Sequence, residues 1–149
     1  MPADLSRIHV ERIDGRKLRC EAGRHVIITD RKIEEGGTDA GCTSGELLLV
    51  SIGSCAAGSA RRYLQEHGLP SVDLAVDVGL RPIAAAGSRD AIVIEVSVSS
   101  DIPERDIAGI ENAALSGGVT SRLAVGSEIE VLVHRVDGTA SKKDDNDAE

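Results

Sequence analysis

The chain has 149 residues, 17 Lys and Arg against 25 Asp and Glu, a net charge of −8, and Tyr63 as its only Phe, Tyr or Trp. Without a basic stripe or stacking aromatics, we expect no nucleic-acid partner, and three cysteines with no CxxC pair do not make a disulfide framework. No apolar leader opens the sequence, and the apolar run at 47–60 is shorter than the about 20 residues that span a bilayer. We therefore predict a cytoplasmic protein with no membrane partner.

Apolar side chains alternate along several segments, which is typical of half-buried strands in antiparallel sheets. Asp14-Gly15 favours a hairpin turn between the first two strands, and Gly23 separates the second from the third. The segments that show the alternation are 8–10, 18–21, 24–29, 72–80, 92–98 and 129–133.

A long helix is predicted from a capping box in which Thr43 caps and Glu46 reaches back. It should run to about His67, where Gly68 ends it. Its stretch 47–60 is apolar on every side, so we expect it to be buried. Small residues at 53, 54, 57 and 58 suit close contact with another helix or with a sheet.

A second helix is predicted from another capping box, Asp101 to Glu104, with a break at Gly117-Gly118 and a short helical turn at 121–124. The order β-β-β-α-β-β-α-β indicates an α+β fold. We expect a single domain over residues 1–136 and a polar, disordered tail over 137–149.

Cys55 lies in the middle of the apolar helix, where a thiol either fills space or acts as a nucleophile shielded from water. Burial alone would raise its pKa, so a reactive thiol needs a neighbouring cation. The candidates are Arg12, Arg16, Arg19, Arg24, Arg61 and Arg62. The four histidines lack metal-ligand spacing, and we predict neither a metal nor a cofactor.

The stretch GGTDAGCTSGELLL at 36–49, followed by Gly53-Ser54-Cys55, resembles the GGxDxGPTPxELLLAALGSC pattern of the osmotically inducible protein C (OsmC) family. That family includes the organic hydroperoxide resistance (Ohr) proteins, and the resemblance extends over roughly residues 6–136. It implies an intertwined homodimer in which each sheet wraps the long helices of the other chain. It also implies that the Cys55 thiolate attacks a peroxide and becomes a sulfenic acid, which a second cysteine captures.

The sequence departs from this family pattern at three positions. The second cysteine is replaced by Gly117, the glutamate of the hydroperoxide branch falls on Gly45 with Glu46 next to it, and the arginine falls on Ile13. Arg12 and Arg16 flank that position. The chain therefore resembles an OsmC-like branch that lacks the second cysteine.

The chain contains two other cysteines that could replace the missing one. Cys42 is separated from Cys55 by thirteen residues, about 20 Å along a helix, far beyond disulfide reach. Cys20 lies on a predicted strand and has no motif support.

Our leading hypothesis is a thiol-dependent redox protein that reduces organic hydroperoxides through Cys55, with an external thiol as reductant. Glu46 is mainly a capping residue. Together with Arg12 and Arg16 it is also a weaker candidate for a catalytic role. The alternative is a non-catalytic dimer that binds a small apolar ligand in its interface cleft, and a third option is a dimer whose cleft is only structural. An arginine beside the thiol would favour the enzyme.

Overall fold

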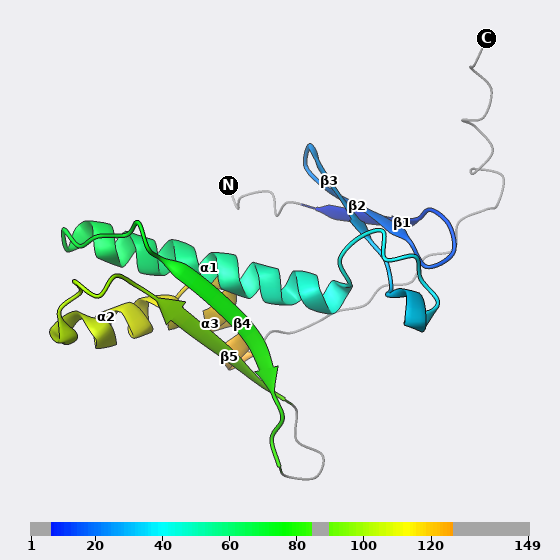
Figure 1. Cartoon of the computed structure of the whole chain (residues 1–149). Helices are drawn as coiled ribbons and strands as arrows, with labels where there is room; N and C mark the ends of the chain where they lie inside the picture. The colour runs from blue at the N-terminus through cyan, green and yellow to red at the C-terminus, as the bar shows by residue number, and fades with distance from the viewer. Residues whose placement is uncertain (1–6, 85–89, 127–149) are drawn as a thin grey trace.

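The computed structural model describes residues 7–84 and 90–126 and has mixed α and β structure (Figure 1). Its antiparallel sheets confirm the predicted α+β class. The predicted strand at 129–133 and the tail at 137–149 lie outside the described residues. The elements in chain order are β1 Ile8–Arg12, β2 Leu18–Ala22, β3 His25–Thr29, the short 3-10 helix η1 Ile33–Glu35, α1 Ser44–Glu66, β4 Ala75–Arg81, β5 Ala91–Ser97, α2 Glu104–Leu115 and α3 Gly118–Val125.

Strands β1, β2 and β3 form an antiparallel sheet in that order. Gly15 and Gly23 stand at the two turns with positive φ values of 46° and 61°, which glycine adopts without strain. The sheet extends beyond the N-terminus of α1 instead of covering the helix (Figure 1). Its large apolar side chains are consequently exposed within one chain, among them Ile8, Val10 and Val26.

Asp30 anchors the loop that leads from this sheet into α1. Its carboxylate is buried and accepts hydrogen bonds from the Arg31, Thr38 and Ala40 amides and from the Thr38 hydroxyl. These bonds hold the pKa of Asp30 far below its usual range, with the Thr38 hydroxyl as the largest cause. The loop is also tightly folded, because a Cβ at Gly41 would lie 2.0 Å from the Ile28 carbonyl oxygen.

Helix α1 begins as the sequence predicts. The Thr43 hydroxyl accepts from the Glu46 amide at 3.2 Å, and the Glu46 carboxylate accepts from the Thr43 amide at 2.8 Å, which is a complete capping box. The prediction that 47–60 is buried on all sides is wrong for a single chain. Only one stripe of α1 is buried, and Leu48 and Val50 are 45% and 58% exposed because the N-terminal sheet does not reach them.

The β4–β5 hairpin and α2 cover the buried stripe of α1. The core cluster consists of Ala60, Leu64, Ile102 and Ile110. Tyr63 on α1 donates a hydrogen bond to the buried Asp106 of α2 at 3.2 Å. A Cβ at Gly109 would lie 2.2 Å from the Tyr63 hydroxyl oxygen, so only glycine lets these two helices approach so closely.

Three predicted boundaries are wrong. The capping box at Asp101 does not form, because the Ser99 hydroxyl accepts from the Asp101 amide and α2 begins only after Pro103, with no side-chain cap. The strand predicted from residue 72 begins at Ala75, since a turn closed by the Leu74 amide and the Ser71 carbonyl precedes it. The short turn predicted at 121–124 is a full helix, α3, that begins at Gly118.

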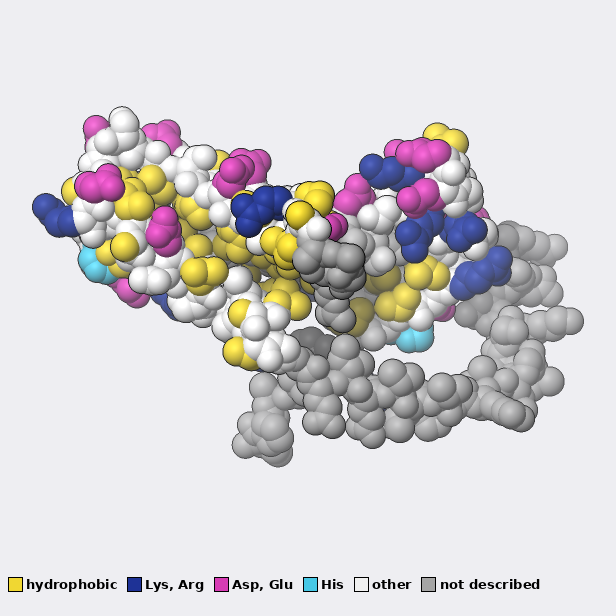
Figure 2. All heavy atoms as spheres, turned by 90° about the horizontal axis from the view of Figure 1, so that it is seen from below, with side chains coloured by type: hydrophobic (Ala, Val, Ile, Leu, Met, Phe, Trp, Pro, Cys, Tyr) yellow, Lys and Arg dark blue, Asp and Glu magenta, His cyan; other side chains and the backbone are white. Residues whose placement is uncertain are grey.

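None of the described helices is both long and apolar enough to cross a membrane. Figure 2 shows one face of the molecule, where apolar side chains gather over the helical part. Lys and Arg side chains gather at the end that carries the β1–β2–β3 sheet.

Candidate active site around Cys55

Cys55 lies in the middle of α1, and the N-terminus of α3 packs against it. Gly117, the N-cap residue of α3, is buried, and a Cβ at this position would lie 2.6 Å from the Cys55 Sγ and 3.0 Å from the Ser59 Oγ. Gly117 has φ −60° and ψ 151°, which any residue adopts, so lack of space and not backbone strain favours glycine here. The position that corresponds to the missing second cysteine therefore faces the Cys55 thiol directly.

The thiol accepts a hydrogen bond from the first turn of α3. The Val119 amide donates to the Cys55 Sγ at 3.4 Å. This bond is the largest cause that lowers the pKa of Cys55, and burial opposes it. The amide and hydroxyl of Thr120 lower the pKa further, although the hydroxyl makes no direct hydrogen bond to the sulfur. The free amides and the positive end of a helix dipole favour a thiolate at such a place. No charged side chain of the described residues contributes to the shift.

Thr120 is the third helical residue of α3, and its side chain is unusual in this surrounding. The residue is 8% exposed, and its Oγ1 is buried without a hydrogen-bond partner among the described residues. A buried hydroxyl without a hydrogen-bond partner is costly in a protein interior and calls for an explanation. The adjacent Val119 amide donates to the Cys55 Sγ, so the thiol is the reactive group of this turn.

The other predicted site residues lie elsewhere within the single chain. Arg12 ends β1, where it pairs with Leu18, and Arg16 follows in the β1–β2 turn with its Nε 3.3 Å from the Cβ position of Gly36. Glu46 is engaged in the capping box and lies 3.6 Å from the Lys32 ammonium, about 14 Å along α1 from Cys55. The structure does not bring these three residues to the thiol. Their catalytic roles stay predictions that depend on a second chain.

All three cysteines are free. Cys20 lies on β2, and Cys42 is exposed just before the α1 cap, where its carbonyl accepts from the Asp30 amide. The side chains of residues 7–84 and 90–126 form no group of three or more that could hold a metal ion.

An apolar cavity of about 290 Å³ adjoins this site. Thr120 lines it together with Ile52, which lies one turn before Cys55 on α1, and with Ile92 and Ile94 of β5. Leu115 and Leu123 also line it, and Asp90 is the single charged lining residue. Thr120 therefore stands between the thiol and an apolar space that would accept a hydrocarbon group.

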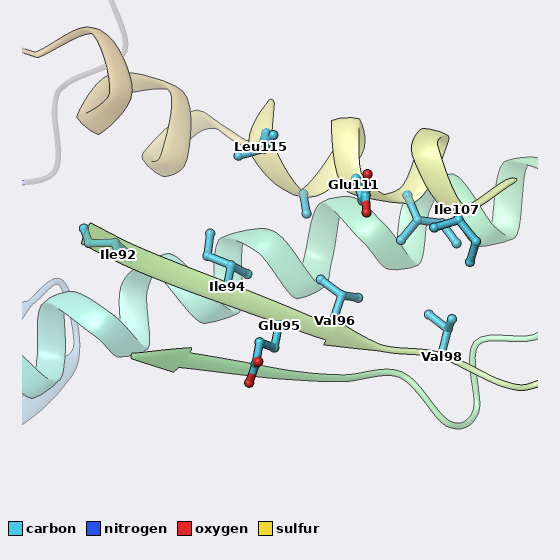
Figure 3. A pocket seen from close by; sticks show the side chains of 10 residues that line it. Ile92, Ile94, Glu95, Val96, Val98, Ile107, Glu111 and Leu115 are labelled. Atoms are coloured by element: carbon cyan, nitrogen blue, oxygen red, sulfur yellow. The ribbon is translucent and has the colours of Figure 1, made fainter. Parts of the chain in front are cut away.

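A larger groove of about 500 Å³ lies between β5 and α2, and Cys55 does not line it. Ile94 and Val96 of β5 and Val98 just after it point toward α2, as Figure 3 shows. Glu95 and Glu111 are its charged lining residues. The groove is mainly apolar but carries these two carboxylates, and no nucleophilic side chain lines it.

A family model described as OsmC-like protein matches residues 37–132 of this chain. The chain belongs to the OsmC-like protein family. The match begins after the β1–β2–β3 sheet, whereas the motif-based resemblance was expected to begin near residue 6. No curated protein matches the chain.

Two solved OsmC-like structures show the same fold. One is a Psychrobacter arcticus protein described as an osmotic stress induced and detoxification response protein, with 17% identity, a TM-score of 0.64, and coverage of 76% of this chain and 85% of that one. The other is a Legionella pneumophila protein described as an organic hydroperoxide resistance protein OsmC and predicted redox protein. It has 10% identity, a TM-score of 0.54, and coverage of 80% of this chain and 90% of that one. At these identities the likeness concerns the fold.

Sequence reasoning identified Cys55 and Gly117 but missed Val119 and Thr120. Both lie in the first turn of α3, which begins three residues before the helical turn predicted at 121–124. The resemblance already set Gly117 opposite Cys55. The signal that could have revealed the two residues was the Gly-Gly-Val-Thr order that follows, if read as the start of a helix.

Proposed function

We propose that this OsmC-like protein reduces organic hydroperoxides through Cys55, with an external small-molecule thiol as the reductant. The observation that carries the proposal is the Val119 amide on the Cys55 Sγ at the N-terminus of α3, which favours the thiolate without an arginine. The apolar cavity beside Thr120 supports an organic substrate over hydrogen peroxide.

The chemistry proceeds in two stages. The Cys55 thiolate attacks the terminal oxygen of ROOH, the O–O bond breaks, and the leaving alkoxide takes a proton to become ROH. The sulfur is oxidised to a sulfenic acid and the peroxide is reduced. One external thiol then attacks the sulfenic acid, forms a mixed disulfide with Cys55 and releases water. A second external thiol attacks this mixed disulfide, which releases the Cys55 thiol and a disulfide of the two external thiols. An external reductant is needed because Gly117 supplies no thiol.

We further propose that the active form is a homodimer. A shallow groove of about 610 Å³ runs along α1 and β4, lined by small and apolar residues of α1 that include Val50, Gly53 and Ala57. Together with the exposed apolar side chains of the N-terminal sheet, this surface is what a second copy would cover. In such a dimer the sheet that carries Arg12 and Arg16 would come from the partner chain. Cytoplasmic thiols would be the natural reductants.

A second candidate function is the binding of a small apolar ligand without turnover. The groove between β5 and α2 favours it, because its volume lies in the range of small-molecule sites and its lining is mostly Ile and Val (Figure 3).

The test is consumption of tert-butyl hydroperoxide by the purified protein with dithiothreitol. Wild type should turn over, Cys55→Ser should lose turnover, and Cys42→Ser, which removes another free thiol, should retain it. Equal consumption by Cys55→Ser and wild type would refute the proposed enzyme. In that case saturable binding of an apolar fluorophore that Val98→Asp weakens would support the ligand-binding alternative, because Val98 lines the groove and not the cavity beside Cys55.

A further inference from the structure

Among the buried side-chain nitrogen and oxygen atoms in the described part of the chain, only the Thr120 hydroxyl oxygen lacks a hydrogen-bond partner. Thr120 follows Val119, whose amide already donates to the Cys55 Sγ at 3.4 Å. The hydroxyl therefore belongs to the same turn of α3 that faces the thiol. The hydroxyl can rotate about its Cβ–Oγ1 bond to present its proton to a nearby acceptor.

We propose that Thr120 donates its hydroxyl hydrogen bond to the Cys55 thiolate and so takes the part that a cationic side chain would otherwise play. The neutral thiol is a weak acceptor and leaves the hydroxyl unsatisfied, whereas the thiolate is a full acceptor. Ionisation of Cys55 thus supplies the partner that the buried hydroxyl lacks. With this hydrogen bond in place Thr120 would be a catalytic residue, since its hydroxyl would touch the reacting sulfur.

The surroundings of the thiol leave this role to Thr120. The exposed charged side chains on the elements around Cys55 do not shift its pKa; they include Arg61 and Arg62 of α1, Asp77 of β4, Asp90 before β5, Glu95 of β5, Glu111 of α2 and Arg122 of α3. The buried Asp106 of α2 accepts from Tyr63, two turns of α1 away from Cys55. Uncharged donors, the Val119 amide and the Thr120 amide and hydroxyl, are what lowers the pKa.

The inference rests on the proposed function in that it concerns the same thiol, but its test needs no peroxide. The rate of iodoacetamide alkylation at Cys55 is followed against pH by mass spectrometry of the Cys55 peptide, which separates this thiol from Cys20 and Cys42. Thr120→Val keeps the volume and removes the hydroxyl, and Thr120→Ser keeps the hydroxyl. Ser59→Ala is the matched control, because that hydroxyl also lies near Cys55 and does not shift its pKa.

We expect Thr120→Val to slow alkylation at neutral pH about tenfold, as loss of one hydrogen bond to a charged group implies. Its rate should recover at high pH, where the thiol is ionised in every variant. Thr120→Ser and Ser59→Ala should match wild type. A thermal melt accompanies each variant, and Thr120→Ala replaces Thr120→Val if the latter does not fold.

Two results would overturn the inference: an unchanged pH profile in a folded Thr120→Val or Thr120→Ala variant, or a Thr120→Ser profile as displaced as that of Thr120→Val. The second result would assign the effect to packing of the methyl group. If Thr120→Val shifts the pH profile of alkylation but the wild type consumes no hydroperoxide, the role of Thr120 stands and the proposed peroxidase activity is refuted. If the wild type consumes hydroperoxide but Thr120→Val leaves the pH profile unchanged, the activity stands and the role of Thr120 is refuted.

Discussion

Gly117→Cys should restore an internal disulfide partner for Cys55. A Cβ at position 117 lies 2.6 Å from the Cys55 Sγ, and the corresponding separation across a disulfide is roughly 3 Å, given an S–S bond of about 2.04 Å. A shift of a few tenths of an ångström between α3 and α1 is therefore sufficient. The φ of −60° and ψ of 151° at Gly117 suit cysteine without backbone strain.

The stabilisation follows from the size of the closed loop. A bond between positions 55 and 117 closes a loop of about 60 residues, for which the chain-entropy relation gives about 4 kcal/mol, an upper value because residual strain subtracts from it. The melting temperature of the oxidised variant should rise by roughly 10 °C. In the reduced form the introduced side chain only crowds the Cys55 thiol, so the reduced variant should melt below wild type.

The assay combines thermal melts with mass spectrometry after mild peroxide treatment. Gly118→Cys is the matched control, because it places a thiol in the same turn with nothing within 4 Å of its Cβ. Gly117→Cys should form the internal bond and turn over faster with a dithiol, whereas Gly118→Cys should do neither. A folded Gly117→Cys variant that forms no bond to Cys55, or equal bonding in both variants, would refute the placement of α3 against α1.

Three further predictions concern the framework of the molecule. Gly109→Ala should destabilise the protein by about 1–3 kcal/mol in chemical denaturation, because its Cβ would lie 2.2 Å from the Tyr63 hydroxyl. Gly118→Ala is the control, since its Cβ would have no atom within 4 Å, and it should leave the stability unchanged. Equal denaturation midpoints for the two variants would contradict this packing. The lowered pKa of Asp30 means that its contribution to stability is present above the unfolded-state pKa of about 3.9 and is lost as the pH falls below it. Asp30→Asn should therefore lower the melting temperature at pH 7 and flatten its fall between pH 5 and 3, and an unchanged pH dependence would exclude this role. Light scattering should give about twice the 15.6 kDa chain mass for wild type, and Gly58→Leu, on the exposed small-residue face of α1, should shift the protein toward monomer; a monomeric wild type would contradict the dimer proposal.

Local signals were sufficient for much of the fold. The start of α1 follows from Thr43 and Glu46, because both capping hydrogen bonds form within four residues. The first two turns follow from Gly15 and Gly23, whose positive φ values are a local property. The start of α2 was not predictable in this way, because the Asp101 amide donates to the Ser99 hydroxyl instead of to the Glu104 carboxylate of a capping box.

Other features depend on contacts between distant segments. The apolar pattern of α1 correctly indicates a helix that needs cover, but one chain covers only the stripe from Ile52 to Leu64, so a single sequence cannot say what covers the rest. The surroundings of Cys55 depend on α3, which approaches from more than sixty residues away in the chain. From the sequence, burial is expected to raise the pKa of Cys55 and an arginine is expected to lower it. In the structure, amides and a hydroxyl lower it instead.

The most direct test of the central claim is a single-turnover oxidation with one equivalent of tert-butyl hydroperoxide, without reductant. Dimedone would trap sulfenic acid, and peptide mass spectrometry would locate it among Cys20, Cys42 and Cys55. We predict rapid dimedone labelling of Cys55 alone, faster than with the same amount of hydrogen peroxide. Labelling that is absent from Cys55, or spread over the three cysteines in proportion to their exposure, would contradict the account.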